Sequence, residues 1–159
     1  MRIGHGYDAH RFAKGRPLVL GGVTIPHDRG LAAHSDGDAV IHALCDALLG
    51  AAALGDIGTY FPDTDVSLEN VDSRILLRKV IGILGEKGHS PVNADITVIA
   101  QEPKLLPYIG DMRITLSGDM GIEPDQINIK ATTTEKMGFI GRKEGIAVHA
   151  VILLKDSDT

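Results

Sequence analysis

Apolar residues recur along this chain with two different periods, and these periods separate the expected helices from the expected strands. From residue 73 to residue 87 they return every three or four positions, which predicts a helix. Leu76, Val80 and Leu84 would lie on its buried face. Gly88, just past the last periodic position, would end it.

An Ala- and Leu-rich run that reaches Leu54 predicts a second helix. We expect Ser35 to be its N-cap, with Asp38 three residues later as the acidic partner in a capping box. A third helix is expected from residue 105 to residue 120, where Gly121 ends it.

Stretches rich in β-branched residues predict strands between these helices. The strands are expected at residues 3–12, 95–101, 127–131 and 146–154, with a hairpin at 18–25. Gly4 and Gly6 weaken the first strand and indicate that another backbone approaches it closely. Strands and helices mix without strict alternation, so we predict an α+β fold in which helices cover one mixed β-sheet, with residues 1–159 as a single domain.

The last expected strand is apolar on both faces. Ile146, Val148 and Ile152 lie on one face, and Val151 and Leu153 lie on the other. Both faces should therefore be buried. Two explanations are open: other copies of the chain cover the second face in a homo-oligomer, or the strand is central within a single subunit.

Composition narrows the possible functions. The 159 residues fit one domain core, and a net charge of -5 without a basic run argues against broad nucleic-acid binding. Cys45 is the only cysteine, which excludes an internal disulfide framework. The N-terminus has no apolar signal segment, and no apolar run reaches the roughly 20 residues of a membrane span. We therefore expect a cytoplasmic protein with neither nucleic acid nor membrane as a partner.

Three side chains form a candidate metal site. Asp8 and His10 stand two apart on the first expected strand and project from one face, and His42 lies one turn into the expected helix. Two imidazoles and a carboxylate suit a cation such as Zn²⁺ and leave a coordination position open for substrate or water. The alternative is a solvated polar surface, with Asp38, His42 and Asp46 as an exposed stripe on the helix.

Other polar segments suggest where an anionic substrate would bind. His34 and Ser35 stand at the expected helix start, where free N–H groups favour phosphate, although Ser35 could act as a cap alone. Residues 56–58 and 61–65 carry closely spaced carboxylates that bind polyol hydroxyls or form surface turns. Residues 131–136 combine hydroxyls, a lysine and a carboxylate able to hold Mg²⁺, or they start a capped helix.

Four motifs resemble one enzyme family. They read RIGHGYDAH at residues 2–10, HSDGDAVIHALCDALLG at 34–50, GDIGTYFPDTD at 55–65 and KATTTEKMGFIGR at 130–142. Together they reach along nearly the whole chain. The chain resembles the 2-C-methyl-D-erythritol 2,4-cyclodiphosphate synthases, lyases of isoprene biosynthesis that make terpenoid precursors in the non-mevalonate pathway.

The resemblance implies an intramolecular phosphoryl transfer. In this family the 2-phosphate of 4-diphosphocytidyl-2-C-methyl-D-erythritol 2-phosphate attacks the β-phosphorus of the cytidine diphosphate arm, which closes the cyclic diphosphate and expels CMP. Also implied are a homotrimer with active sites between subunits and a divalent metal, usually zinc, on Asp8, His10 and His42. A second ion, Mg²⁺ or Mn²⁺, would be held by Glu135 and the substrate diphosphate.

The resemblance also assigns roles to individual positions. His34 and Thr133 would stabilise the transition state. Asp56, Gly58 and residues 61–65 would hold the erythritol portion, and residues 100–106 and 131–135 the cytidine with its phosphates. The full set of implied substrate contacts comprises Asp8, Ala9, His10, His34, Ser35, Asp56, Ile57, Gly58, Phe61, Pro62, Asp63, Thr64, Asp65, Ala100, Gln101, Glu102, Pro103, Lys104, Leu105, Leu106, Ala131, Thr132, Thr133, Thr134, Glu135, Phe139 and Arg142.

Two positions depart from the family pattern. Tyr7 stands where the family usually has Phe, and His149 stands where it often has an acidic residue. Together with Phe139 and Arg142, they concern the central cavity of the implied trimer. Family members can hold an isoprenoid diphosphate in that cavity, so the departures bear on this second ligand and not on the reaction.

Two other functions compete with the lyase. A metal-dependent phosphohydrolase would use similar ligands but needs an activated water near phosphorus, and it would release inorganic phosphate. A non-catalytic trimeric module could instead bind a nucleotide or an isoprenoid around a structural metal. A structural zinc site normally closes with four protein ligands, whereas this sequence offers three.

Overall fold

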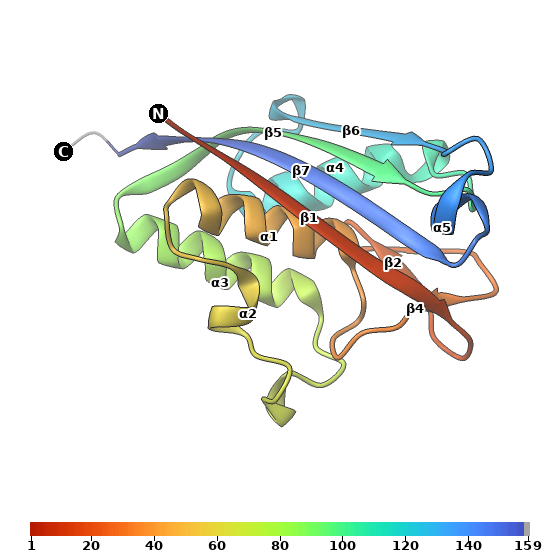
Figure 1. Ribbon diagram of the computed structural model, residues 1–159. Coiled ribbons are helices and arrows are strands. Elements are labelled where there is room, and N and C mark those ends of the chain that lie inside the picture. Colours follow the sequence, from red (N-terminus) through yellow and green to blue (C-terminus); the bar gives the residue numbers. More distant parts are fainter. Residues whose placement is uncertain (158–159) are drawn as a thin grey trace.

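A mixed five-stranded sheet with helices on one face organises the chain in a computed structural model, which describes residues 1–157 (Figure 1). The strands follow the order β4-β1-β7-β5-β6. Their bounds are Arg2–Ala13 for β1, Gly30–Leu31 for β4, His89–Ile99 for β5, Ile127–Thr132 for β6 and Gly145–Asp156 for β7. Only the pairing of β5 with β6 is parallel; the other three pairings are antiparallel. The predicted single α+β domain with one mixed sheet is confirmed.

Three long helices cover this sheet. They are α1 (Ala39–Ala51), α3 (Ser73–Glu86) and α4 (Ile109–Met120), and α1 lies between the sheet and α3 (Figure 1). The predicted helices at these places are confirmed, and Gly121 ends α4 in the left-handed conformation. Within residues 1–157 no helix has the length and apolar character to cross a membrane.

Short elements complete the chain. The predicted hairpin forms from β2 (Leu18–Leu20) and β3 (Val23–Ile25). The sequence patterns did not predict the single-turn helices α2 (Ile57–Tyr60), α5 (Gly138–Gly141), η1 (Val66–Leu68) and η3 (Pro124–Gln126), whereas η2 (Leu106–Tyr108) lies within the third predicted helix. Such short turns lack the repeated apolar spacing by which longer helices are recognised.

Helix α1 begins later than expected, and its N-cap is Asp38 rather than Ser35. One Asp38 oxygen accepts hydrogen bonds from the backbone N–H groups of Ile41 and Gly21, and the other accepts one from Gly22. The carboxylate thereby joins the β2–β3 hairpin to the helix start, which a serine hydroxyl could not do. Asp38 is fully buried, and this burial, aided by the nearby charge of Asp36, raises the pKa of its carboxyl to about 6. The capping prediction was wrong, as was the alternative of an exposed polar stripe that included Asp38.

Strand β1 lies unusually close to α1 because it carries Gly4 and Gly6. A Cβ atom at Gly6 would overlap the carbonyl oxygen of Ala43, and one at Gly4 would overlap that of Ala47. The close approach predicted from these glycines is confirmed. It brings the strand that carries Asp8 directly onto the first turns of the helix.

Strand β7 is central, between β1 and β5, but its second face is covered only in part. Ile146, Val148 and Ile152 are buried against the helices. On the opposite face Val151 is 38% exposed, and Ile3 on the neighbouring strand β1 is 74% exposed. The prediction that both faces are buried therefore does not hold within one subunit, and an apolar sheet face is left open.

We expect Gly6→Ala to lower the free energy of unfolding by about 3 kcal/mol or more, because the added methyl group forces β1 away from α1. Chemical denaturation measures the loss. Gly82→Ala in α3 is the matched control, since nothing lies near its new Cβ and the helix should gain about 0.5 to 1 kcal/mol. Equal stability of Gly6→Ala and the wild type would contradict the close packing.

Candidate metal centre and adjoining cavities

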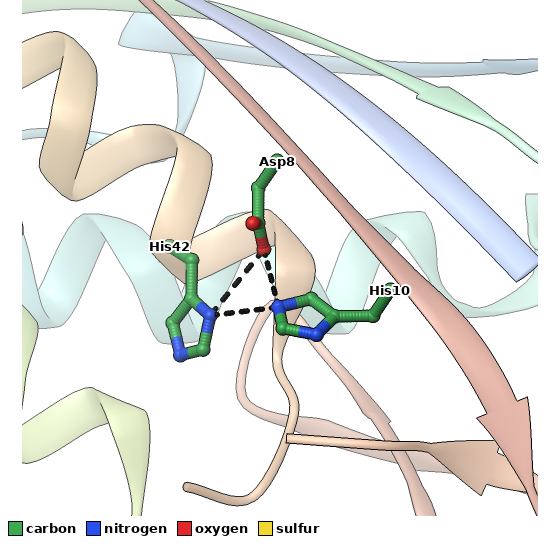
Figure 2. Close-up of side chains that lie close together, drawn as sticks. All are labelled: Asp8, His10 and His42. Atoms are coloured by element: carbon green, nitrogen blue, oxygen red, sulfur yellow. Dashed lines mark hydrogen bonds and ion pairs between the residues drawn. The ribbon is translucent and has the colours of Figure 1, made fainter. Parts of the chain in front are cut away.

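Asp8, His10 and His42 converge on one point between β1 and α1 (Figure 2). The Oδ2 atom of Asp8 lies 2.8 Å from Nε2 of His10 and 3.3 Å from Nδ1 of His42. The two imidazole nitrogens are 3.2 Å apart. The sequence prediction that these three side chains meet is therefore confirmed, and the alternative of a solvated polar surface is not, because each side chain is largely buried.

The geometry of the three atoms fits a tetrahedral cation. Ligand atoms about 2.0–2.1 Å from a tetrahedral zinc ion lie roughly 3.3 Å from each other, close to the separations found here. Within residues 1–157, the buried Oδ2 of Asp8 lies against the two imidazoles and has no other hydrogen-bond partner. The lone pairs thus point towards a shared centre, which makes this triad a possible site for a divalent metal.

Hydrogen bonds on the far side of each imidazole support this orientation. Nδ1 of His10 lies 2.8 Å from the carbonyl oxygen of Ala32, to which it can only donate, so Nε2 keeps its lone pair for the site. Nε2 of His42 lies 3.0 Å from the hydroxyl oxygens of both Ser35 and Ser73. These contacts leave Nδ1 of His42 directed at Asp8.

The charges and hydrogen bonds within the triad favour the ionised form of Asp8. Burial by itself raises the pKa of Asp8, but hydrogen bonds and charges from His10 and His42 outweigh it and lower this pKa to about 2. Burial lowers the pKa of His10, and the hydrogen bond and charge of Asp8 outweigh it, so the net pKa is raised. Asp8 is therefore ionised at neutral pH, while a proton competes with a metal for His10.

A cavity of about 420 Å³ opens onto the triad. Its walls comprise Asp8, His10, Ala32, Ala33, His34, Ser35, His42, Ile57, Gly58, Phe61, Asp63, Leu68, Val71 and Leu76. The carboxylate-rich segments at 56–58 and 61–65 therefore do reach the metal centre. Asp56 and Asp65 are occupied as caps of α2 and η1, and Pro62 and Thr64 are not part of the cavity wall.

His34 lines this cavity without lying at a helix start. Because α1 begins at Ala39 with the Asp38 carboxylate over its N-terminus, the prediction that His34 and Ser35 lie at the helix start was wrong, while their contact with an anionic substrate stays a prediction. Instead Nε2 of His34 lies 2.9 Å from the carbonyl oxygen of Asp65, to which it donates. The imidazole thereby connects the metal side of the cavity to the segment that follows α2.

A second cavity, of about 380 Å³, gathers the other predicted binding segments. It is lined by Ala100, Gln101, Pro103, Lys104, Leu105, Leu106, Ala131, Thr132 and Thr133. Glu102 is not among them, because its carboxylate faces Lys143 at 2.9 Å and Arg29 at 3.4 Å. Thus residues 100–106, apart from Glu102, share one hollow with residues 131–133, as expected for segments that bind one part of a ligand.

The loop that follows β6 has an uncommon backbone. Glu135 and Lys136 both adopt positive φ angles, of 52° and 64°, in the left-handed region that side chains disfavour. The hydroxyl oxygen of Thr133 accepts a hydrogen bond from the N–H of Glu135 at 3.1 Å. Glu135 lines neither cavity and is exposed, and helix α5 starts only at Gly138, so the alternative of a capped helix start at residues 131–136 is not observed.

The remaining predicted contacts lie away from both cavities. Ala9 points to the opposite side of β1 from Asp8 and His10 and is exposed. Phe139 is 42% exposed on α5, and Arg142 pairs with Glu144 at 3.1 Å. Sequence patterns missed Ser73, which touches His42, because a serine at the start of a helix gives no sign of what lies beside it.

The sequence profile of the YgbB family matches residues 1–155. This chain therefore belongs to the YgbB family. A relative from Azotobacter vinelandii, named 2-C-methyl-D-erythritol 2,4-cyclodiphosphate synthase, is 62% identical over 97% of this chain and 98% of its own length. These matches confirm the resemblance found in the sequence motifs.

Solved structures agree with this YgbB family assignment. A 2C-methyl-D-erythritol-2,4-cyclodiphosphate synthase in its CDP-bound form is 40% identical, with a TM-score of 0.89, and covers 97% of this chain and 100% of its own. The bifunctional IspDF from Campylobacter jejuni gives a TM-score of 0.95 at 48% identity. The match covers 99% of this chain but only 42% of that longer protein.

We expect metal affinity at the triad to fall as pH is lowered. His10 must lose its proton to bind a metal, and its raised pKa means that this proton begins to compete at a higher pH than for an ordinary histidine. The apparent affinity for Zn²⁺ should drop about tenfold per pH unit or more below that pKa. Competition with a chelator between about pH 8 and about pH 5 measures it. A constant affinity across this range would contradict binding through His10.

Proposed function

We propose that this YgbB family chain is a CMP-releasing lyase, a 2-C-methyl-D-erythritol 2,4-cyclodiphosphate synthase. Its substrate would be 4-diphosphocytidyl-2-C-methyl-D-erythritol 2-phosphate, and its products the 2,4-cyclodiphosphate and CMP. The observation that carries the proposal is the Asp8–His10–His42 triad opening into a cavity within a chain 62% identical to enzymes of that name. Residues 1–159 would form its one catalytic domain, and a lone buried cysteine, Cys45, is compatible with the cytoplasm.

Two divalent ions would take part. Asp8, His10 and His42 would hold zinc, while Glu135 would hold Mg²⁺ or Mn²⁺ together with the substrate diphosphate, as suits an ion that usually binds few protein carboxylates. Bound there, such cations neutralise negative charge on the reacting phosphate oxygens.

The protein's own groups would position the two reacting phosphates. The cavity at the triad offers Ile57, Gly58 and Asp63 to the erythritol portion. The imidazole of His34 and the hydroxyl of Thr133 would lie where charge grows in the transition state and would stabilise it. Because the attacking oxygen belongs to the substrate itself, the chain needs no nucleophile, and its task is to hold two mutually repelling anions in line.

The second cavity would hold the cytidine diphosphate arm. Lys104 provides a cation at its wall, and Ala100, Ala131 and Thr132 provide a neutral surface for a base and ribose. A solved relative described as a CDP-bound form supports a nucleotide ligand for this fold. The remaining contacts implied by the family, at Ala9, Glu102 and Thr134, stay predictions.

A homotrimer with active sites between subunits is part of the proposal. The triad cavity and the second cavity share no wall residue. One substrate could therefore occupy the triad cavity of one subunit and the second cavity of a neighbouring subunit. The open sheet face with Ile3, Tyr7 and Val151 provides apolar surface for such an assembly. An isoprenoid diphosphate near Phe139 and Arg142 would be a further ligand of the same assembly.

Phosphorus NMR of the purified protein with substrate and Mg²⁺ tests the function directly. We expect signals of the cyclic diphosphate and CMP without inorganic phosphate; accumulating inorganic phosphate would favour the phosphohydrolase instead.

His42→Ala should lose the zinc and lower turnover on the order of 10²-fold or more, while the oligomer stays assembled. Unchanged metal content by elemental analysis would refute the triad as the zinc site.

Glu135→Ala tests the second ion. We expect the Mg²⁺ or Mn²⁺ concentration needed for half-maximal rate to rise about tenfold, because the ion loses its protein carboxylate while the zinc content stays at the wild-type level. Glu123→Ala is the control, since this exposed carboxylate directly precedes the turn η3 and lies outside both cavities. The same metal titration for Glu135→Ala and the wild type would argue against the role.

A further inference from the structure

A partly buried chain of hydrogen bonds lies behind His42, on the side away from the metal centre. Nε2 of His42 is 3.0 Å from the hydroxyl oxygen of Ser73, and that oxygen is 2.6 Å from Oδ1 of Asp36. Ser73 is the first residue of α3 and is fully buried. The three groups therefore connect the start of α3 to the metal ligand on α1.

The direction of these hydrogen bonds follows from the chemistry of the groups. The carboxylate of Asp36 can only accept, so the hydroxyl of Ser73 donates its hydrogen to it. The serine oxygen then has only lone pairs to offer, and Nε2 of His42 must carry the hydrogen that it accepts. A neutral imidazole protonated on Nε2 has its free lone pair on Nδ1, the atom that faces Asp8.

The carboxylate at the end of this chain is itself held in place. Its Oδ2 atom accepts the backbone N–H of Ser73 at 3.1 Å, and its Oδ1 atom accepts that of Asp38 at 3.1 Å. The backbone N–H of Asp36 donates to the carbonyl oxygen of Val71 at 3.1 Å. Asp36 is thus fixed by the segments that lead into α1 and α3, and its position determines which way the hydroxyl of Ser73 points.

Ser35 also lies within hydrogen-bond distance of Nε2 of His42, but its other contacts do not fix the direction of its hydroxyl hydrogen. Its hydroxyl oxygen accepts the N–H of Gly37 at 3.3 Å, and among the described residues no carboxylate fixes its hydrogen. The Ser35 hydroxyl can therefore donate to His42 or accept from it. Only the path through Ser73 to Asp36 selects one tautomer.

We infer that Asp36 and Ser73 are positioning residues, which hold His42 as the Nε2–H tautomer and thereby strengthen binding of a divalent metal through Nδ1. The inference rests on the proposed function only in that the triad must bind a metal. Such partners behind a metal ligand commonly change metal affinity by about 10- to 100-fold. His10 has the equivalent support from the carbonyl oxygen of Ala32.

Competition for Zn²⁺ between the full-length protein and a chromophoric chelator tests the inference. We expect Ser73→Ala and Asp36→Asn each to weaken zinc binding about 10- to 100-fold, and Ser73→Thr, which keeps the hydroxyl, to restore most of the affinity. Ser117→Ala is the matched control, because Ser117 is also a buried helical serine but donates only to the carbonyl oxygen of Ile114. Its zinc affinity should equal that of the wild type.

The outcomes separate the two proposals. Wild-type protein that binds no zinc at the triad would defeat the metal site itself. Zinc binding of wild-type strength in both Ser73→Ala and Asp36→Asn, with folds intact by circular dichroism, would overturn the positioning role and leave the metal site standing. A larger loss of zinc affinity in Ser35→Ala than in Ser73→Ala would also overturn the positioning role of Ser73 and Asp36.

Nitrogen NMR of the zinc-loaded wild type gives a check that needs no variant. We expect His42 to show a protonated Nε2 whose hydrogen exchanges slowly with water, and a metal-bound Nδ1. Ligation through Nε2, or a rapidly exchanging Nε2 hydrogen, would contradict the path to Asp36, whether or not the variants fold.

Discussion

The close contact between strand β1 and helix α1 is the constraint on which the rest of the structure depends. Two ligands of the candidate metal centre come from the strand and one comes from the helix, so their separation is set by how near the two backbones lie. Gly4 and Gly6 allow that approach because any side chain there would meet the carbonyl oxygens of α1. The metal geometry is therefore a consequence of backbone packing two and four residues before Asp8.

Three carboxylates near the start of α1 have different roles because their surroundings differ. Asp38 is enclosed and accepts three backbone N–H groups, so it joins the hairpin to the helix. Asp36, two residues earlier, faces the serine that adjoins His42. Asp8 lies between two imidazoles, which stabilise its ionised form. Hydrogen-bond donors in each place determine whether a buried carboxylate supports the fold, a ligand or a metal.

Much of the fold and of the metal centre could be predicted from the sequence, because both follow from local spacing. The period of the apolar residues located the long helices, and the D-x-H spacing on a strand placed two ligands on one face. Placing His42 beside them required the family resemblance or the structure, since spacing cannot bring a helix to a strand. The N-cap was misplaced because Ser35 and Asp38 are both good capping residues, and a tertiary contact with Gly21 and Gly22 decided between them. Ser73 was missed for the same reason: its role depends on what α3 packs against.

Anomalous X-ray scattering from crystals grown with zinc tests the central claim most directly. The account predicts one strong zinc peak per chain, roughly 2.0–2.2 Å from Oδ2 of Asp8, Nε2 of His10 and Nδ1 of His42, with a fourth position turned towards the cavity. A peak at a different place, a fourth protein ligand closing the site, or no peak at the triad would contradict it.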